Sequence, residues 1–448
     1  MNIIETYDVV VAGGGPAGIC AAVAAARSGA RTLLIEMSGS LGGMAGGGLV
    51  PVICGYSDGI RIIHRGIALE FLNEIRAYMG ENAVDANDVS QSSLRLESKG
   101  IHFFVEAEAV KFAAEQLVLN SGTDIMFFTT LCGVEKSSVD TVKSAIIANR
   151  NGIFEVQAPL FIDCTGDATL CTFAGASIMK GNDQREMQPV SLCSIMNGLP
   201  TEWFTDDVWQ KIIADQEFPL IKDNFFCPFL VGNLFRVNGG HLWNIDGSDN
   251  DSVSHAMING RNLVKQFRDA LRKYVPEAAD INIVQTAELP GIRESRRIVG
   301  SYQLTGDDYR QRRRFADEIA LNSYYIDTHP SLEQRQQERE GRWQWSDQYE
   351  IYRNGEVHGI PYRCLTPDGL KNVINAGRSI SSDRIANSAV RVMANCMSMG
   401  QAAGIAAALL IETRQHDFHQ IDVRILQTRL KRLGAYLPDL PVGSGKEI

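Results

Sequence analysis

Two stretches in the second half of the chain carry side chains suited to binding anions and moving protons. In the first, Arg293, Glu294, Arg296 and Arg297 follow a Pro-Gly turn. Guanidinium groups can hold a carboxylate by two parallel hydrogen bonds, so these arginines are candidates for binding an anionic substrate. The same grouping is typical of a salt-bridge network between two domains, and both interpretations stay open.

The second stretch contains His358, Tyr362 and Arg363, at the point where the chain is expected to return to its first domain. An imidazole titrates near neutral pH and can exchange a proton with a substrate. We predict that the catalytic residues are Arg293, Arg297, His358, Tyr362 and Arg363. A packing or surface role is the alternative for each.

One more histidine has a neighbour that could orient it. His329 follows Asp327 by two residues, a spacing that would let the carboxylate hold the imidazole. The remaining histidines are expected to be structural or to lie on an exposed terminal helix; they are His64, His102, His241, His255, His416 and His419.

A glycine turn near the N-terminus predicts a nucleotide site that would position this chemistry. The apolar run 9–12 leads into Gly13, Gly15 and Gly18, and then into an Ala-rich helical segment. In the dinucleotide-binding fingerprint the first glycine makes the turn, the second lets the backbone approach a pyrophosphate, and the third lets helix and strand pack closely. Pro16 and Ala17 open the helix, whose N-terminus attracts the anion.

An acidic residue follows at the distance that a ribose requires. The apolar run 32–35 ends in Glu36, eighteen residues after Gly18. A carboxylate there accepts hydrogen bonds from ribose hydroxyls and repels a 2′-phosphate, so NADP is disfavoured.

Other glycine turns favour FAD over NAD. A glycine patch over 39–48 includes Gly42, Gly43 and Met44, and bare backbone of this kind suits an extended ligand. No second fingerprint follows in mid-chain. Further predicted cofactor-binding positions are Thr165, Gly166, Gly377, Arg378, Val392 and Met393. A nicotinamide-dependent dehydrogenase and a flavin-bearing binding or assembly protein without turnover remain the alternatives.

The chain is long enough for two or three domains and its pattern predicts an α/β protein. We predict a discontinuous, Rossmann-like FAD-binding domain over 1–180 and 366–448, with an inserted mixed α+β substrate domain over 181–365. Apolar periodicity predicts helices over 106–120 and 393–412, a hairpin around Asn151-Gly152, and few long helices in the insert.

Composition limits the function classes. The 43 Lys and Arg against 53 Asp and Glu give a net charge of −10, which disfavours a nucleic-acid partner. Nine cysteines without CxxC or His/Cys spacing suit reduced thiols in a cytoplasmic protein and predict no metal site. Neither a signal peptide nor a membrane-spanning apolar run is expected. The expected partner is a small-molecule substrate; the electron acceptor and a homo-oligomeric state are left open.

The chain resembles the bacterial FAD-dependent oxidoreductase family of the glutathione-reductase-like flavoprotein superfamily. The matching stretches run through nearly the whole chain: 13–18, 41–44, 163–167, 289–297, 325–329, 360–365, 377–378, 391–393 and 400–404. The resemblance implies a non-covalent FAD and a redox reaction, with substrates that differ across the family.

One segment departs from that pattern. Relatives commonly carry a His-Glu pair after Gly377-Arg378, whereas this chain has Arg384-Ile385. A fixed cation in place of a neutral base favours a more anionic substrate if this turn faces the flavin.

Overall fold

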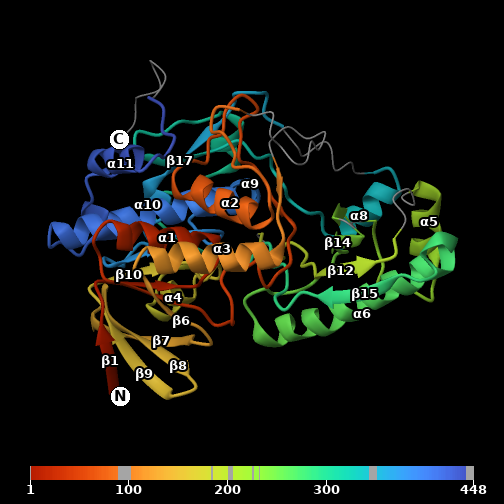
Figure 1. Cartoon of the computed structure of the whole chain (residues 1–448), viewed down its shortest axis with the longest axis horizontal. Coiled ribbons are helices and arrows are strands. Elements are labelled where there is room, and N and C mark those ends of the chain that lie inside the picture. Colours follow the sequence, from red (N-terminus) through yellow and green to blue (C-terminus); the bar gives the residue numbers. More distant parts are fainter. Residues whose placement is uncertain are drawn as a thin grey trace.

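A five-stranded parallel sheet forms the centre of the chain (Figure 1). The computed structural model describes residues 2–88, 102–182, 185–199, 205–224, 227–231, 233–342 and 351–439. In spatial order the strands are β19 (Val373–Asn375), β10 (Leu160–Asp163), β2 (Val9–Ala12), β3 (Thr32–Ile35) and β6 (Asp124–Met126). All residues of the first four are buried, which explains why these strands are near-continuous apolar runs.

The two faces of this sheet are covered differently. Val9 and Val11 pack in the core that contains the helices, whereas Val10 and Ala12 pack in a second cluster. Neighbouring residues of a strand point to opposite faces, so one strand contributes to both cores. The second cluster belongs to a mixed layer whose strands are β1 (Asn2–Thr6), β9 (Gly152–Gln157), β8 (Thr141–Asn149) and β7 (Thr130–Ser138), with β1 parallel to β9 and the other pairs antiparallel. β8 and β9 confirm the predicted hairpin around Asn151-Gly152.

On the other face, α1 (Pro16–Arg27) and α10 (Met393–Glu412) lie in close contact. Cβ atoms at Gly400 and Gly404 would lie 2.0 and 2.2 Å from the carbonyl oxygens of Ala17 and Ala21. Only glycine permits this approach of the two backbones. Among the described residues, α10 alone is long and apolar enough to cross a membrane by length and composition, and 89% of that window is buried in the fold.

A second lobe, formed by the described residues between 187 and 292, has its own hydrophobic cluster (right in Figure 1). Its antiparallel sheet contains β13 (Cys227–Val231), β14 (Leu234–Asn238), β12 (Cys193–Asn197) and β15 (Asn282–Thr286). α6 (Asn250–Tyr274) and α5 (Asp206–Ala214) cover it. The 25-residue α6 is the one long helix among the described residues of 181–365, where few long helices were expected.

The remaining described elements connect and cover these layers. They are β4 (Val52–Ile53), α2 (Ile67–Tyr78), β5 (Phe103–Phe104), α3 (Ala107–Asn120), α4 (Thr169–Phe173), β11 (Ile178–Lys180), β16 (Arg296–Ile298), α7 (Gly306–Arg310), β17 (Glu318–Asn322), α8 (Leu332–Arg339), β18 (His358–Pro361), α9 (Arg384–Val390) and α11 (Val423–Arg432). α3 and α10 confirm the two predicted helices.

The predicted insert does not coincide with a single core. Leu304, Phe315, Ile319 and Ile360 pack in the same cluster as α1 and α10, although they fall within 181–365. Among the described residues of 181–365, the second lobe forms a separate cluster, and Tyr309, Ile326 and Tyr352 belong to a further small one. The mixed α/β architecture with a parallel sheet is therefore established, while the division into two domains stays a prediction.

Candidate active site

The carboxyl edge of the parallel sheet brings the predicted cofactor-binding loops together. Ala12 pairs with Ile35 and with Asp163, and Asp163 pairs with Asn375. The loops after β2, β3, β10 and β19 therefore start side by side. In open α/β sheets, ligands bind outside this edge.

The three fingerprint glycines differ in the space around them. Gly13 has φ +98°, and a Cβ there would lie 2.5 Å from the Cys164 carbonyl oxygen. At Gly18 a Cβ would lie 1.8 Å from the oxygen of Gly13. A Cβ at Gly15 would find only the Cα of Gly43, at 4.0 Å. The fold thus needs Gly13 and Gly18 for packing and leaves room above Gly15, which fits a pyrophosphate lying against that residue.

The second glycine patch faces the first. Gly42 and Gly43 have φ of +104° and +49°, and the Gly42 N–H donates to the Gly14 carbonyl over 2.9 Å. A Cβ at Gly43 would lie 2.9 Å from the Cα of Gly15. Met44 follows in the same turn and is half-buried. Two stretches of bare backbone therefore border the space at the start of α1.

Glu36 is fixed by the turns on both sides of it. Its Oε2 accepts from the Gly14 N–H at 2.7 Å, and its Oε1 accepts from the Ser38 N–H at 2.8 Å. The side chain is buried without a cation among these contacts. Each carboxylate oxygen can accept a second hydrogen bond, so Glu36 fits a pair of ribose hydroxyls.

The turns after β10 and β19 are held by polar side chains. Asp163 is buried and accepts from the Thr165 N–H and hydroxyl at 3.1 and 2.7 Å. Arg378 donates to Asp167 over 2.6 Å and lies across Gly166, whose Cβ would be 3.0 Å from the Arg378 Cζ. The buried Nε of Arg378 has no hydrogen-bond partner. This orphaned donor fits a polar ligand passing the turn.

The start of α10 lies next to the segment after β4. Val392 is the N-cap and Met393 the first helical residue. A Cβ at Gly55 would lie 3.6 Å from Val392 and 3.3 Å from Tyr324, so the segment after β4 packs here too. Gly377, with φ +107°, faces Ala17 of α1. Thirteen of the fifteen predicted cofactor positions thus lie in loops or helix starts that follow strands of the parallel sheet, and Val392 and Met393 lie at the start of α10.

Ionisable side chains gather beside the start of α10. Arg391, which directly precedes the N-cap, donates to the backbone oxygen and the carboxylate of Asp327 over 2.9 and 3.0 Å. His329 Nε2 lies 3.4 Å from the other Asp327 oxygen. Burial raises the pKa of Asp327, but His329, Arg391 and Arg293 outweigh it and lower that pKa to about 2. Asp327 is therefore an anion at neutral pH.

Burial and neighbouring charges also shift the pKa values of Arg293 and His329. Arg293 is buried, donates to the Pro189 carbonyl over 2.7 Å, and has its pKa lowered to about 10 by burial and by the charge of Arg391. Burial and the Arg293 charge hold the pKa of His329 well below its usual range. The imidazole is therefore neutral at neutral pH and can act as a base.

Comparison with known proteins identifies the family. The model of a family described as "FAD dependent oxidoreductase" matches residues 8–430. The chain belongs to the FAD-dependent oxidoreductase family. The match settles the choice between FAD and NAD in favour of FAD, and the protein is an enzyme of this family, not a flavin-bearing assembly protein.

Relatives of this FAD-dependent oxidoreductase act in different processes. It is 30% identical over 175 residues to a digeranylgeranylglycerophospholipid reductase of Thermoplasma volcanium, covering 36% of this chain and 40% of that protein. It is 31% identical over 352 residues to a tRNA uridine 5-carboxymethylaminomethyl modification enzyme of Lactococcus lactis, covering 68% of this chain and 56% of that enzyme. The chain thus spans about half the length of these relatives. A geranylgeranyl bacteriochlorophyll reductase-like protein from Thermoplasma acidophilum is 15% identical, with TM-score 0.48 and coverage of 96% and 84%.

Arg297 belongs to a buried ion cluster of this FAD-dependent oxidoreductase. It pairs with Glu294 and donates to the carbonyls of Ser382 and Gly181 over 3.0 and 3.1 Å. Arg384 donates to the same glutamate over 3.2 Å. This is a salt-bridge network of the kind that the sequence left open, and the predicted catalytic role of Arg297 stays a prediction.

Three other predicted catalytic residues have the contacts of packing residues. His358 is fully buried between Tyr309 and Tyr352, and burial lowers its pKa to about 3. The Tyr362 hydroxyl donates to the Phe418 carbonyl over 3.0 Å, and Arg363 pairs with Asp317 over 2.9 Å.

None of these contacts reaches a predicted cofactor position, so the structure gives His358, Tyr362 and Arg363 packing partners, and their catalytic roles stay predictions. Their position in the sequence suggested that they lie near the cofactor, and the contacts described above do not bring them there.

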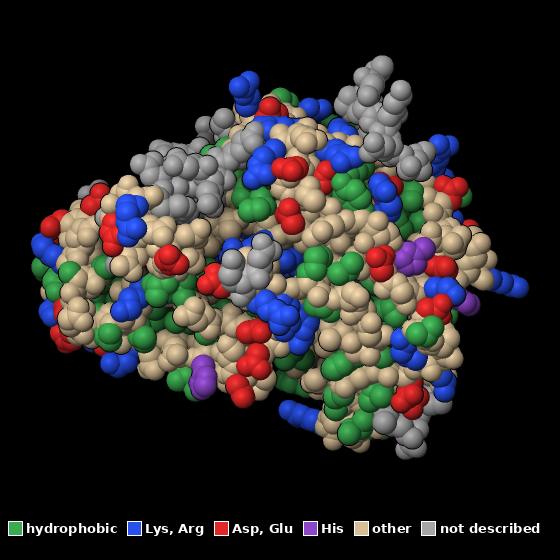
Figure 2. Space-filling view, turned by 180° about the vertical axis from the view of Figure 1, so that it is seen from behind, with side chains coloured by type: hydrophobic (Ala, Val, Ile, Leu, Met, Phe, Trp, Pro, Cys, Tyr) green, Lys and Arg blue, Asp and Glu red, His purple; other side chains and the backbone are tan. Residues whose placement is uncertain are grey.

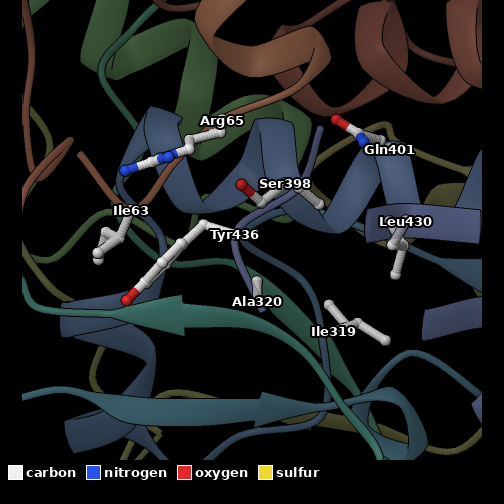
Figure 3. Close-up of a pocket in the computed structure, with 9 residues that line it drawn as sticks. Ile63, Arg65, Ile319, Ala320, Ser398, Gln401, Leu430 and Tyr436 are labelled. Carbon is white, nitrogen blue, oxygen red and sulfur yellow. The ribbon is translucent and has the colours of Figure 1, made fainter. Parts of the chain in front are cut away.

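The small cavity shown in Figure 3 is not a substrate site. It encloses about 10 Å³ between α10, α11 and β17, and its lining includes Ser398, Gln401 and Leu430. Such a space holds one water molecule at most. In Figure 2, Lys and Arg side chains gather instead at the middle of the face where the second lobe joins the body.

Proposed function

We propose that this enzyme transfers a hydride between flavin N5 and a small organic substrate that carries an anionic group. The proposal includes a glutathione-reductase-like ancestry and a substrate-binding role for the region 181–365. It rests on one observation: the buried group of Arg391, Asp327 and His329 at the start of α10, with Arg293 nearby.

Different residues of the chain would bind different parts of the cofactor. Gly13 to Gly18 and the start of α1 would hold the pyrophosphate, and Glu36 the adenosine ribose. Thr165, Gly166 and Arg378 would border the middle, and Val392 and Met393 the far end. FAD supplies the hydride acceptor or donor at N5 when bound.

An anionic substrate matches the balance of charge in the cluster. Arg293 and Arg391 face one carboxylate, that of Asp327, and the imidazole of His329 is neutral. The group therefore keeps an excess positive charge in a buried place, where a desolvated cation gains from an anionic ligand. Arg391 also has a buried Nε without a hydrogen-bond partner, so it has a donor left for a carboxylate.

His329 is placed to handle the substrate proton. Oxidation of an alcohol or amine removes a hydride from carbon and a proton from oxygen or nitrogen, and the proton needs a base. The neutral imidazole of His329 meets that need, and the anionic Asp327 stabilises the ring once it is protonated.

The other expectations remain part of the proposal. The net charge of −10 disfavours nucleic acid as a partner, and nine cysteines without CxxC or His/Cys spacing fit a cytoplasmic location. Neither the lipid nor the tRNA named for the relatives is proposed as the substrate here. The electron acceptor and the oligomeric state are left open.

Binding of anions to the holoenzyme tests the site. The flavin absorption spectrum is recorded during titration with small carboxylates and with the matching amides. We expect a saturable spectral change with a carboxylate and a weaker one with its amide, and loss of at least tenfold in affinity in Arg391→Gln. Arg424→Gln, on the exposed side of α11, is the matched control. Equal affinity of Arg391→Gln and wild type would contradict the assignment.

A further inference from the structure

A chain of four buried side chains joins the candidate site to the second lobe. Asp223 contacts Nδ1 of His241, and Nε2 of His241 lies 2.8 Å from Nδ1 of His329. His329 Nε2 then faces Asp327 at 3.4 Å. The side chains of all four are at most 14% exposed. The series Asp223–His241–His329–Asp327 is called the relay below.

The outer end of the relay borders a hollow of about 260 Å³. Asp223 lines it together with α5 and with Arg335 and Glu338 of α8. Asp206 and Gln210, also in its lining, are exposed, so the hollow opens to solvent. In Figure 1, α5 and α8 lie at the end of the second lobe remote from α1 and α10. The relay thus runs from the solvent side of this lobe to the start of α10.

The number of N–H protons on the two histidines limits how the relay can be hydrogen-bonded. Both carboxylates are ionised, because His241 and Arg335 lower the pKa of Asp223 against the effect of its burial, and Asp327 has a pKa of about 2. Burial lowers the pKa of both histidines, and the charges of Arg293 and Arg335 add to this, so both rings are neutral. Two neutral imidazoles supply two N–H protons for three contacts. One contact must lack a proton.

The distances show which contact that is. Two acceptors without a proton between them repel, so the longest contact, His329 Nε2 to Asp327, is the one without a proton. His241 then donates from Nδ1 to Asp223, and His329 donates from Nδ1 to His241. The same logic operates in the Ser-His-Asp triad, where a buried aspartate holds its histidine in one tautomer.

We propose that Asp223 and His241 are positioning residues that hold His329 in the tautomer whose Nε2 accepts a proton, and that the relay passes this proton to the hollow. The catalytic part rests on the proposed function. His329 Nε2 takes a proton from the substrate, and the Nδ1–H of His329 moves to His241 Nε2. The Nδ1–H of His241 moves to Asp223, which releases it to water. One proton enters and one leaves, and no electron moves through the relay.

A metal ion does not explain the same residues. Among the described residues, no group of three or more His, Cys, Asp or Glu side chains could hold one. The two imidazoles face each other nitrogen to nitrogen at hydrogen-bond distance, which leaves no space for an ion between them.

The tautomers can be measured without any substrate. Holoenzyme with ¹⁵N-labelled histidine is studied by NMR at pH 7, and the His241 and His329 signals are assigned from His241→Gln and His329→Gln. We expect both rings to be neutral with the proton on Nδ1. A His329 ring that carries its proton on Nε2, or both protons, overturns the proposal.

Variants of Asp223 test action at a distance. In Asp223→Asn the amide can donate to His241 Nδ1, and we expect the His329 tautomer to change although residue 223 does not touch that ring. Asp206→Asn, in the same hollow, is the matched control and should change nothing. An unchanged His329 tautomer in folded Asp223→Asn contradicts the positioning role.

Chemical rescue tests the route to the hollow. In Asp223→Ala, formate can enter the space that the side chain left and accept from His241. We expect added formate to restore the wild-type His329 signals, and the absence of rescue in a folded variant overturns the route. These outcomes do not depend on turnover, so a failed hydride-transfer proposal would appear in substrate experiments with the relay signals intact.

Discussion

Substitution of Gly15 by alanine separates cofactor binding from folding. The backbone at Gly15 has φ −75° and ψ −177°, which alanine adopts without strain. The nearest atom to the new methyl group would be the Gly43 Cα at 4.0 Å. Loss of chain entropy in the unfolded state offsets the weaker N-cap, so stability of the apoprotein should change by less than about 1 kcal/mol.

The same methyl group would fill the space assigned to the pyrophosphate. Forcing a methyl group into a close-packed contact costs about 1–3 kcal/mol. This corresponds to a rise of about 5- to 150-fold in the Kd for FAD. Apoprotein prepared by removing FAD is titrated with the cofactor while flavin fluorescence is followed, and thermal unfolding of the apoprotein is recorded in parallel.

Gly18→Ala should behave in the opposite way. Its Cβ would lie 1.8 Å from the Gly13 carbonyl oxygen, so α1 must move away from β2 and the apoprotein itself should lose about 1–3 kcal/mol or more. Wild-type FAD affinity in a folded Gly15→Ala protein would refute the assignment of the pyrophosphate to this turn. Equal melting temperatures of Gly18→Ala and wild type would refute the packing argument.

Three further predictions concern buried groups. Asp327→Asn should lower the free energy of unfolding by about 2 kcal/mol at pH 7, because the pKa of Asp327 falls from 3.8 in the unfolded chain to about 2 in the fold. The stability difference between wild type and variant is full above about pH 4 and disappears as the pH falls towards 2. Melting temperatures measured across this pH range test it. Burial holds the pKa of His358 near 3, while the pKa in the unfolded chain is near 6.5. The unfolded chain therefore gains a proton at this residue below pH 6.5 and the folded protein does not, so stability falls as the pH falls. His358→Phe should flatten the decline in melting temperature between pH 7 and 5. Gly400→Ala should lower the melting temperature and weaken FAD binding together, because its Cβ would lie 2.0 Å from the Ala17 carbonyl of α1, and unchanged values of both would contradict the helix contact.

Local sequence patterns were sufficient to predict the strands and helices around the proposed cofactor site. The strands over 9–12 and 32–35, α1 and α10 follow from continuous apolar runs and glycine spacing, which depend on residues near in sequence. Most of the predicted cofactor positions lie together because parallel strands place their following loops at one edge. Glu36 is a clear instance, since its distance from Gly18 alone indicated its place.

The residues proposed for proton transfer could not be placed in this way, because they meet through tertiary contacts. Asp223 and His241 are 18 residues apart, and His241 and His329 are 88 apart. His241 was expected to be structural and Asp223 gave no signal. Arg391 lies in one of the stretches that match the family, but the sequence assigned it no role. His358 lies where the chain was expected to return to its first domain, but it packs between two tyrosines. Only the pairing of His329 with Asp327, two residues apart, was visible locally.

Anaerobic reduction of the bound flavin tests the central claim most directly. Holoenzyme is mixed without oxygen with small hydroxy acids, amino acids and their neutral amides, and absorbance is followed at the flavin band near about 450 nm. The account predicts that at least one acid bleaches the flavin, that its amide does so far more slowly, and that His329→Gln slows bleaching while still binding FAD. Bleaching that is equally fast with acid and amide, or unaffected in His329→Gln, would contradict it.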